Sequence, residues 1–502
     1  MFVQKDIDLL LSHSKTVRIM AVLYDENYQE IDSLQGNILA APVSKTSDSD
    51  IRSSCSVNIL VNGRKDSNLD FESLWIDRMV EISYGVLDPS TNDYVWYRFG
   101  KMLITDSRST YNKGMQEVKM SIVDLMAALT EAKGSQIGSP MLIPAGTNIR
   151  NALLAIVSEY APYKRCNIPE FEDVIPYDIN IEIGTYPYQS LKTIMDLFPY
   201  YEMLYDIDGV FTVREIPTKI EDPVDISYEI IDQILLNENT EDRSARFSDV
   251  KNTVEIWGKS LDALYTATSC VSNGSCYNLF IIDSFETLVV GETYGFTPDI
   301  DSVYRQSIKI QETPECQIFS ESGAGKYTLI AEGALRANVP YVVKYVDDKF
   351  VLLGELEVHT IVQEIKEAPS IFAIDKFKRD NACNDVEWVI NPDSPFACIE
   401  NSIHGIDRQK KIVLSGGEYG NIYSTSLAIE RGRYELWQKT RLQDTVSLRM
   451  LLVPWLDVND KISYTSPSSG EVVTIIVKSI SFDFPRWSMS VSGSKFYPVY
   501  PW

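Results

Sequence analysis

The stretch Trp75-Ile-Asp-Arg-Met-Val-Glu-Ile-Ser-Tyr84 returns near the end of the chain as Trp455-Leu-Asp-Val-Asn-Asp-Lys-Ile-Ser-Tyr464. The two stretches align without gaps, and five of their ten positions carry the same residue. Such a repeat predicts two copies of one structural unit, in which the shared residues take equivalent positions. We expect these residues to be Trp75, Asp77, Ile82 and Tyr84 in the first copy, and Trp455, Asp457, Ile462 and Tyr464 in the second.

The sequence that follows each copy is typical of a long β-hairpin. After the first copy, Trp96–Ile104 is followed by Glu117–Ile122. After the second, Val472–Phe482 is followed by Trp487–Val491. These segments are rich in β-branched and aromatic residues with partial alternation, as in half-buried strands. Two copies of one β unit, far apart in the chain, predict two similar β-barrels with other domains inserted between them.

The periodicity changes between the two barrels. The apolar residues of Asn148–Tyr160 fall on one helical face, and Tyr423–Arg441 has a second helical pattern. The predicted fold is therefore mainly β with α+β parts, containing two related tube-like β-barrels, an intervening α+β domain and a β-rich insertion. The expected boundaries are a first barrel at 1–135, an α+β domain at 136–222, a second barrel at 223–260 plus 445–502, an insertion at 261–375 and an irregular, helical domain at 376–444.

The charge balance limits the possible partners. The 502 residues include 71 Asp and Glu against 46 Lys and Arg, a net charge of −25. A surface of this sign does not bind nucleic acid by neutralising phosphates. No run of about 18 apolar residues occurs, so no membrane span and no stable membrane association are expected. The N-terminal stretch also lacks the charged-then-apolar plan of a signal peptide.

The sequence offers little that is typical of catalysis or metal binding. His13, His359 and His404 are the three histidines, and they lie far apart without a metal-ligand spacing. The seven cysteines form no CxxC pair, although Cys270 and Cys276 are close enough in sequence for a bridge, a question the sequence leaves open. We therefore predict a protein that is not an enzyme, with no catalytic residue, no metal and no cofactor.

Several segments resemble parts of the tail hub (baseplate hub) proteins of tailed phages and related injection systems. In the first barrel the resemblance rests on Ser49–Val57, Trp96–Ile104 and Val118–Leu129, although Ser53 and Ser54 stand where the family has Arg and Thr. It extends through the α+β domain and the closing domain, in the segments Ile143–Tyr160, Gly184–Glu215, Ser415–Trp437 and Val453–Asp457. Residues 261–375 lie outside it.

The resemblance implies a structural virion protein. Hub proteins of this family are homotrimers that close the distal end of the tail tube. Two barrels in each of three subunits match a six-fold tube. The implied partners are the tail tube protein, distal tail or baseplate proteins and the tape measure protein, with DNA only in passage through an acidic lumen. The implied location is the tail tip of the virion, after assembly in the host cytoplasm.

Two interpretations from other classes remain. The chain could be a peripheral baseplate protein that binds a receptor or glycan, with residues 261–375 as the contact module. It could also be a tail-associated cell-wall hydrolase, although such enzymes usually have a recognisable catalytic domain. With 71 acidic residues, some carboxylate pairs must lie close together by chance, so proximity alone is no argument for glycosidase chemistry.

Overall fold

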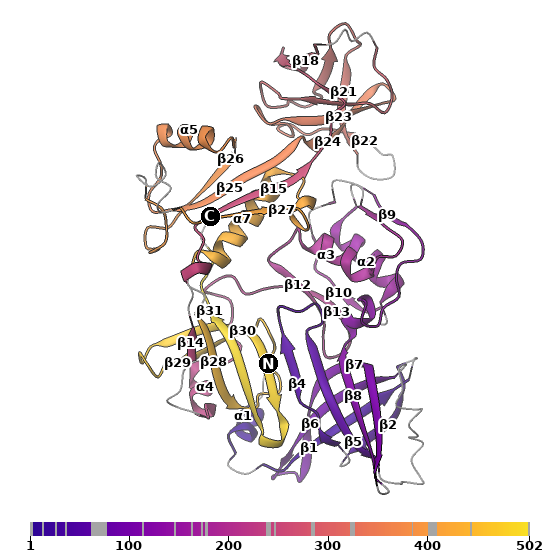
Figure 1. The fold of residues 1–502 in the computed structure, drawn as a ribbon, viewed down its shortest axis with the longest axis vertical. Helices are drawn as coiled ribbons and strands as arrows, with labels where there is room; N and C mark the ends of the chain where they lie inside the picture. Colours follow the sequence, from indigo (N-terminus) through magenta and orange to yellow (C-terminus); the bar gives the residue numbers. More distant parts are fainter. Residues whose placement is uncertain are drawn as a thin grey trace.

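The fold was analysed in a computed structural model. The structure describes all residues except 1–3, 13–14, 26–27, 36–37, 62–77, 113–114, 145–146, 162–163, 172–173, 176–178, 237–241, 245–246, 283–286, 322–326, 384, 400–408, 442–443 and 500–502. Figure 1 shows an elongated molecule with a large curled sheet at one end, two smaller modules in the middle and a β-rich module at the other end. The protein is mainly β, as predicted.

The large sheet contains thirteen strands from both ends of the chain. Their order is β14-β28-β31-β30-β4-β5-β8-β7-β6-β1-β2, with β29 beside β30 and β3 beside β5. The N-terminal strands are β1 (Val17–Tyr24), β2 (Glu30–Gln35), β3 (Ile38–Ala40), β4 (Val43–Thr46), β5 (Ser53–Val61), β6 (Met79–Asp88), β7 (Asp93–Asn112) and β8 (Met115–Asp124). The others are β14 (Asp242–Ser244), β28 (Thr445–Leu451), β29 (Lys461–Thr465), β30 (Val472–Asp483) and β31 (Ser488–Lys495).

Two groups of four strands within this sheet have the same arrangement. In the first the spatial order is β5-β8-β7-β6, and in the second it is β28-β31-β30-β29. Each group is antiparallel, and in each the second, third and fourth strands along the chain form a meander. The two predicted hairpins are therefore present, at β7–β8 and β30–β31.

The two groups are not separate closed barrels, which is where the fold differs from the expectation. Strand β4 pairs with β30, so the hydrogen-bonded sheet runs from one group into the other. One continuous hydrophobic core serves both. Aromatic rings meet across it: the ring centroids of Tyr84 and Phe484 lie 4.5 Å apart, and those of Phe99 and Phe482 lie 4.9 Å apart. Because β4 closes the gap between the groups, their apolar faces are buried against each other.

The α+β module lies between the large sheet and the rest of the chain (Figure 1). Its core is built from α2 and α3, which contact one another, and from the hairpin β12–β13. Asn148 caps the N-terminus of α2, since its side chain accepts a hydrogen bond from the Arg150 amide. The elements are η2 (Leu125–Leu129), β9 (Met141–Ile143), α2 (Ile149–Tyr160), β10 (Cys166–Asn167), β11 (Ile179–Ile181), α3 (Pro187–Met195), β12 (Tyr201–Tyr205) and β13 (Phe211–Glu215).

A four-stranded sheet with the order β26-β25-β15-β27 forms the next module, and α7 (Thr425–Lys439) packs on one of its faces. Its strands are β15 (Thr253–Ser260), β25 (Glu357–Ile365), β26 (Asp385–Ile390) and β27 (Lys411–Ser415), and α5 (Ile371–Asp380) lies on the other face. The sequence had placed residues 253–260 in the second barrel. The structure pairs β15 with β25 and β27 instead, because a half-buried strand pattern does not specify which sheet receives the strand.

The β-rich insertion is a separate module at the end of the molecule opposite the large sheet (Figure 1). It has its own core and a nine-stranded arrangement. The strands are β16 (Tyr265–Thr266), β17 (Ser269–Ser272), β18 (Cys276–Phe280), β19 (Thr293–Phe296), β20 (Ser307–Ile310), β21 (Cys316–Glu321), β22 (Tyr327–Leu329), β23 (Tyr341–Val346) and β24 (Lys349–Glu355). The remaining elements are α1 (Gln4–Leu11), α4 (Tyr228–Ile234) and the short turns η3 (Phe247–Asp249), η5 (Tyr419–Asn421) and η6 (Phe484–Arg486).

Candidate functional site

The most constrained polar site lies where the two halves of the large sheet meet the α+β module. We call it the junction cluster and define it as Lys45, Arg52, Glu202, Arg214, Asp457 and Asn459. At its centre is the Glu202 side chain, which is 9% exposed. Its carboxylate accepts hydrogen bonds from Arg52 and Asn459, and from Nε of Arg214 at 2.5 Å. One side chain of the α+β module therefore binds both halves of the sheet.

Asp457 connects the two halves directly. Its Oδ1 lies 3.1 Å from Nζ of Lys45, a lysine of β4 that is 8% exposed. Burial by itself would raise the pKa of Asp457, but the nearby cations of Lys45, Arg214 and Arg52 outweigh it, so the pKa lies below its usual value. The Asp457 carboxylate is therefore held in its charged form, and its ion pair with Lys45 joins β4 to the C-terminal half of the large sheet.

Asp460 lies beside this ion pair, and its pKa is shifted in the opposite direction, upward. Its Oδ2 accepts a hydrogen bond from the Asp457 amide at 2.7 Å. Burial raises the pKa of Asp460 to about 7, and the carboxylates of Asp457 and Asp225 add to the effect. At the neighbouring joint, burial likewise raises the pKa of Asp196 to about 6. Two carboxyl groups at the joints of this protein therefore titrate well above the usual range for Asp.

We expect Asp460→Asn to stabilise the protein above neutral pH. Because the folded-state pKa lies above the unfolded value, the folded state binds the proton more tightly, and stability falls as pH rises from about 4 to about 7. The Asn side chain is neutral at every pH, and its carbonyl oxygen can still accept a hydrogen bond from the Asp457 amide. The melting temperature of the variant should exceed that of the wild type at pH 8 and match it more closely at pH 5. Equal differences at both pH values would contradict this assignment.

A second joint connects the α+β module to the module of α7. Arg431 of α7 is 11% exposed at its side chain, and its Nη1 donates to the Asp196 carbonyl at the end of α3 over 3.0 Å. Its Nη2 lies 3.2 Å from Glu418 and 3.1 Å from Glu435. Beside it the ring of Tyr200 meets that of Tyr434 edge-on, with centroids 5.2 Å apart. This joint is fixed by both ion pairs and aromatic packing.

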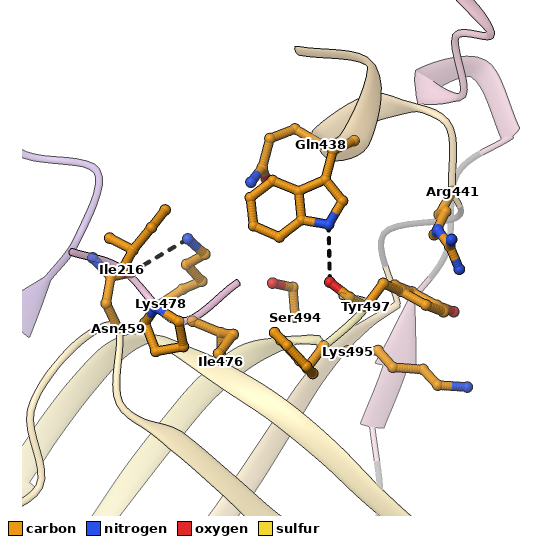
Figure 2. Close-up of a pocket in the computed structure, with 12 residues that line it drawn as sticks. Ile216, Gln438, Arg441, Asn459, Ile476, Lys478, Ser494, Lys495 and Tyr497 are labelled. Carbon is orange, nitrogen blue, oxygen red and sulfur yellow. Dashed lines mark hydrogen bonds between the residues drawn. The ribbon is translucent and has the colours of Figure 1, made fainter. Parts of the chain in front are cut away.

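The cavity in Figure 2 lies between the end of α7 and strands β30 and β31. Trp437 closes one side of it, and its indole Nε1 donates to the Tyr497 carbonyl at 2.9 Å. On the other side, Nζ of Lys478 lies 3.5 Å from Oδ1 of Asn459. The volume is about 70 Å³, which is room for a few water molecules and too small for a substrate. This cavity is a packing joint between modules.

The structure describes six of the eight residues that the repeat singled out. Ile82 and Tyr84 in β6, and Ile462 and Tyr464 in β29, are all fully buried. The Tyr84 hydroxyl donates to the Ala41 carbonyl at 2.5 Å. Asp457 belongs to the junction cluster. Trp455 is half-buried, and its ring centroid lies 5.8 Å from that of Tyr97. Trp75 and Asp77 lie outside the described residues.

His359 lies in the four-stranded sheet, outside the joints. His359 is stacked on Trp257 at a centroid distance of 3.7 Å, and its Nε2 lies 2.9 Å from Glu255. His13 and His404 lie outside the described residues. All seven cysteines are free, Cys270 and Cys276 included. Among the described residues no group of three or more His, Cys, Asp or Glu is placed to hold a metal ion. The described helices include none with the length and apolarity needed to cross a membrane.

Residues 393–500 match a family model described as a domain of unknown function, DUF5048. No curated protein matches the chain. Over nearly its whole length the chain is similar in structure to phage tail proteins. The tail protein of Neisseria meningitidis MC58 is 9% identical, with 96% of this chain and 98% of that chain covered at a TM-score of 0.48.

Two further solved structures are similar at 8–9% sequence identity. The 43 kDa tail protein of prophage MuSo2 from Shewanella oneidensis is 9% identical, covers 96% of this chain and 98% of its own, and has a TM-score of 0.47. The prophage tail protein gp18 from Listeria monocytogenes is 8% identical, covers 95% and 94%, and has a TM-score of 0.40. Similarity at this distance assigns no role to individual residues.

Sequence reasoning identified Asp457 but not the rest of the junction cluster. Lys45, Arg52, Glu202 and Arg214 stand in unremarkable strand sequences, and no local pattern distinguishes them from other charged residues. Most of their partners are remote: Lys45 and Asp457 are 412 positions apart, and Arg52 and Glu202 are 150 apart. Two signals were available in the sequence: the repeat singled out the Asp457 position, and the opposite charges of Glu202 and Arg214 face each other across one hairpin.

Proposed function

We propose that this chain is a tail hub: a structural protein of which three copies close the distal end of a tail tube. The observation that supports this most directly is the pair of four-stranded groups with one spatial order inside a single sheet. Each chain then supplies two related units, joined edge to edge, to a ring. Three chains supply six, which matches a six-fold tube. The buried Ile–Ser–Tyr positions of β6 and β29 support a common origin of the units.

The contacts between modules favour the interpretation that this protein is a rigid scaffold rather than an enzyme. Two polar clusters lie between modules, where Glu202 and Arg431 each bind two or more modules together. A hub must transmit force between the tube and the tail tip, and buried charge-assisted hydrogen bonds fix the relative positions of domains. We place the tube protein, the tape measure protein and distal baseplate proteins among the partners, with the β16–β24 module reaching outward to a neighbour.

Light scattering on the purified full chain tests this function. We expect the mass of a trimer, either for the protein alone or after addition of the tail tube protein. Because the net charge is −25, the trimer is also expected not to shift double-stranded DNA in a gel at low salt, as suits a channel through which DNA only passes. A chain that stays monomeric with tube protein present would contradict the hub and favour a peripheral, receptor- or glycan-binding role.

A further inference from the structure

We propose that the cavity between the large sheet and the hairpin β12–β13 binds a small oxyanion of the phosphate class. This site lies beyond the proposed hub function and does not depend on it. The cavity has a volume of about 150 Å³, against about 70 Å³ for the cavity in Figure 2. Since one water molecule needs only a fraction of this space, the cavity has room for a tetrahedral ion.

Residues of both modules line this cavity, and the cations among them outnumber the carboxylates by four to three. Lys45 comes from β4, Arg52 from the position before β5, Lys101 from β7 and Arg214 from β13. The whole chain carries a net charge of −25. A local excess of positive charge between two modules of such an acidic protein favours a negatively charged ligand.

The three carboxylates of the lining have donors of their own. Asp124 and Asp206 each accept hydrogen bonds from two backbone amides, at 2.7–2.9 Å. Asp457 accepts a hydrogen bond from Nζ of Lys45 at 3.1 Å. These contacts leave other donors of the lining without an acceptor.

Two side chains of the lining have buried donors with no acceptor among the described residues. Nη2 of Arg52 donates to Glu202, but Nη1 is buried and has no hydrogen-bond partner in the described part of the chain. The same is true of the Tyr205 hydroxyl. Burial raises the pKa of Tyr205, so this hydroxyl keeps its proton and can donate it in a hydrogen bond. Unsatisfied buried donors are costly, above all when one of them is charged.

An oxyanion satisfies both donors and balances the charge at once. Phosphate presents several acceptor oxygens, and the planar guanidinium group of arginine matches them well. A water molecule can accept from Arg52 or from Tyr205, but it leaves the excess positive charge unbalanced. Because the two donors belong to different modules, the bound ion connects β12 to the start of β5. An ion that binds only this folded joint stabilises it by mass action.

Isothermal titration calorimetry of the full chain with inorganic phosphate tests the site, with sodium chloride added to hold the ionic strength constant. We expect saturable binding of one ion per chain. Tyr205→Phe keeps the ring and removes one hydrogen bond to a charged acceptor, so it should weaken phosphate binding about tenfold. Tyr111→Phe is the matched control, because Tyr111 is 74% exposed at the far end of β7, and it should bind phosphate like the wild type.

A second pair of variants keeps the test valid if Tyr205→Phe disturbs the joint. Lys101→Gln removes a cation of the lining and should weaken phosphate binding about fivefold. Lys119→Gln removes an exposed cation of β8 and should leave the binding unchanged.

A crystal structure of the full chain with phosphate provides a readout that needs no variant. We expect one tetrahedral density within hydrogen-bond distance of Arg52 and Tyr205. Separate water peaks in its place would overturn the proposal, and so would the absence of saturable binding. An adventitious ion only, bound equally well by Tyr205→Phe and Lys101→Gln, would also overturn it. The hub function would stand in each case.

Discussion

Glu202→Ala is expected to lower the free energy of local unfolding around β12 and β13 by about 3–5 kcal/mol, because it removes one member of a buried, hydrogen-bonded charge network. The carboxylate accepts hydrogen bonds from Arg52, Arg214 and Asn459. Arg52 would lose its hydrogen-bonded carboxylate in a buried setting, and Arg214 would keep only the longer, 4.0 Å contact with Asp457. The cost comes mostly from this loss of close pairing for the two cations.

Hydrogen exchange read by mass spectrometry is the suitable measurement, since a chain of several modules does not unfold in one step. Amides of β12 and β13 should lose protection, and so should those of β4, which belongs to the same joint. Glu215→Ala, on the exposed side of β13, is the matched control and should change stability by less than about 0.5 kcal/mol. If both variants exchange like the wild type, the junction cluster does not hold the modules together.

Tyr84→Ala and Tyr464→Ala are each expected to cost about 3–5 kcal/mol, since both rings are fully buried in the shared core and their loss leaves a large cavity. The two residues occupy the same position of the repeat, at the ends of its two copies. If the copies are equivalent, the two substitutions should destabilise the sheet by similar amounts. Urea unfolding of the large sheet, followed by tryptophan fluorescence, measures both.

Two controls separate burial from chemistry. Tyr111→Ala removes the same side chain from the far end of β7, where it is 74% exposed, and should change stability by less than about 0.5 kcal/mol. Tyr84→Phe keeps the ring and removes only the hydrogen bond to the Ala41 carbonyl, for a loss of about 1 kcal/mol. A large cost at Tyr84 with a small cost at Tyr464 would argue against equivalent copies.

Sequence reasoning was strongest where structure depends on neighbours in the chain. The hairpins at β7–β8 and β30–β31 and the helices α2 and α7 were predicted from strand alternation and helical periodicity, which are local properties. The repeat also identified Ile82, Tyr84, Ile462 and Tyr464, all of them buried. An apolar residue at an inward position of a strand is buried whichever sheet the strand joins.

Only the tertiary structure decided how these elements join. Strand β15 fits its periodicity equally well in either sheet, and the structure places it with β25 and β27. The pairing of β4 with β30 merges two expected barrels into one sheet, and the Glu202 carboxylate accepts hydrogen bonds from Arg52 near the start of the chain and Asn459 near its end. Strand periodicity determines which face of a strand is buried, but the choice of partner edge depends on residues hundreds of positions away. For that reason the sequence by itself determined the two β units, and the fold determined the joints that make them one body.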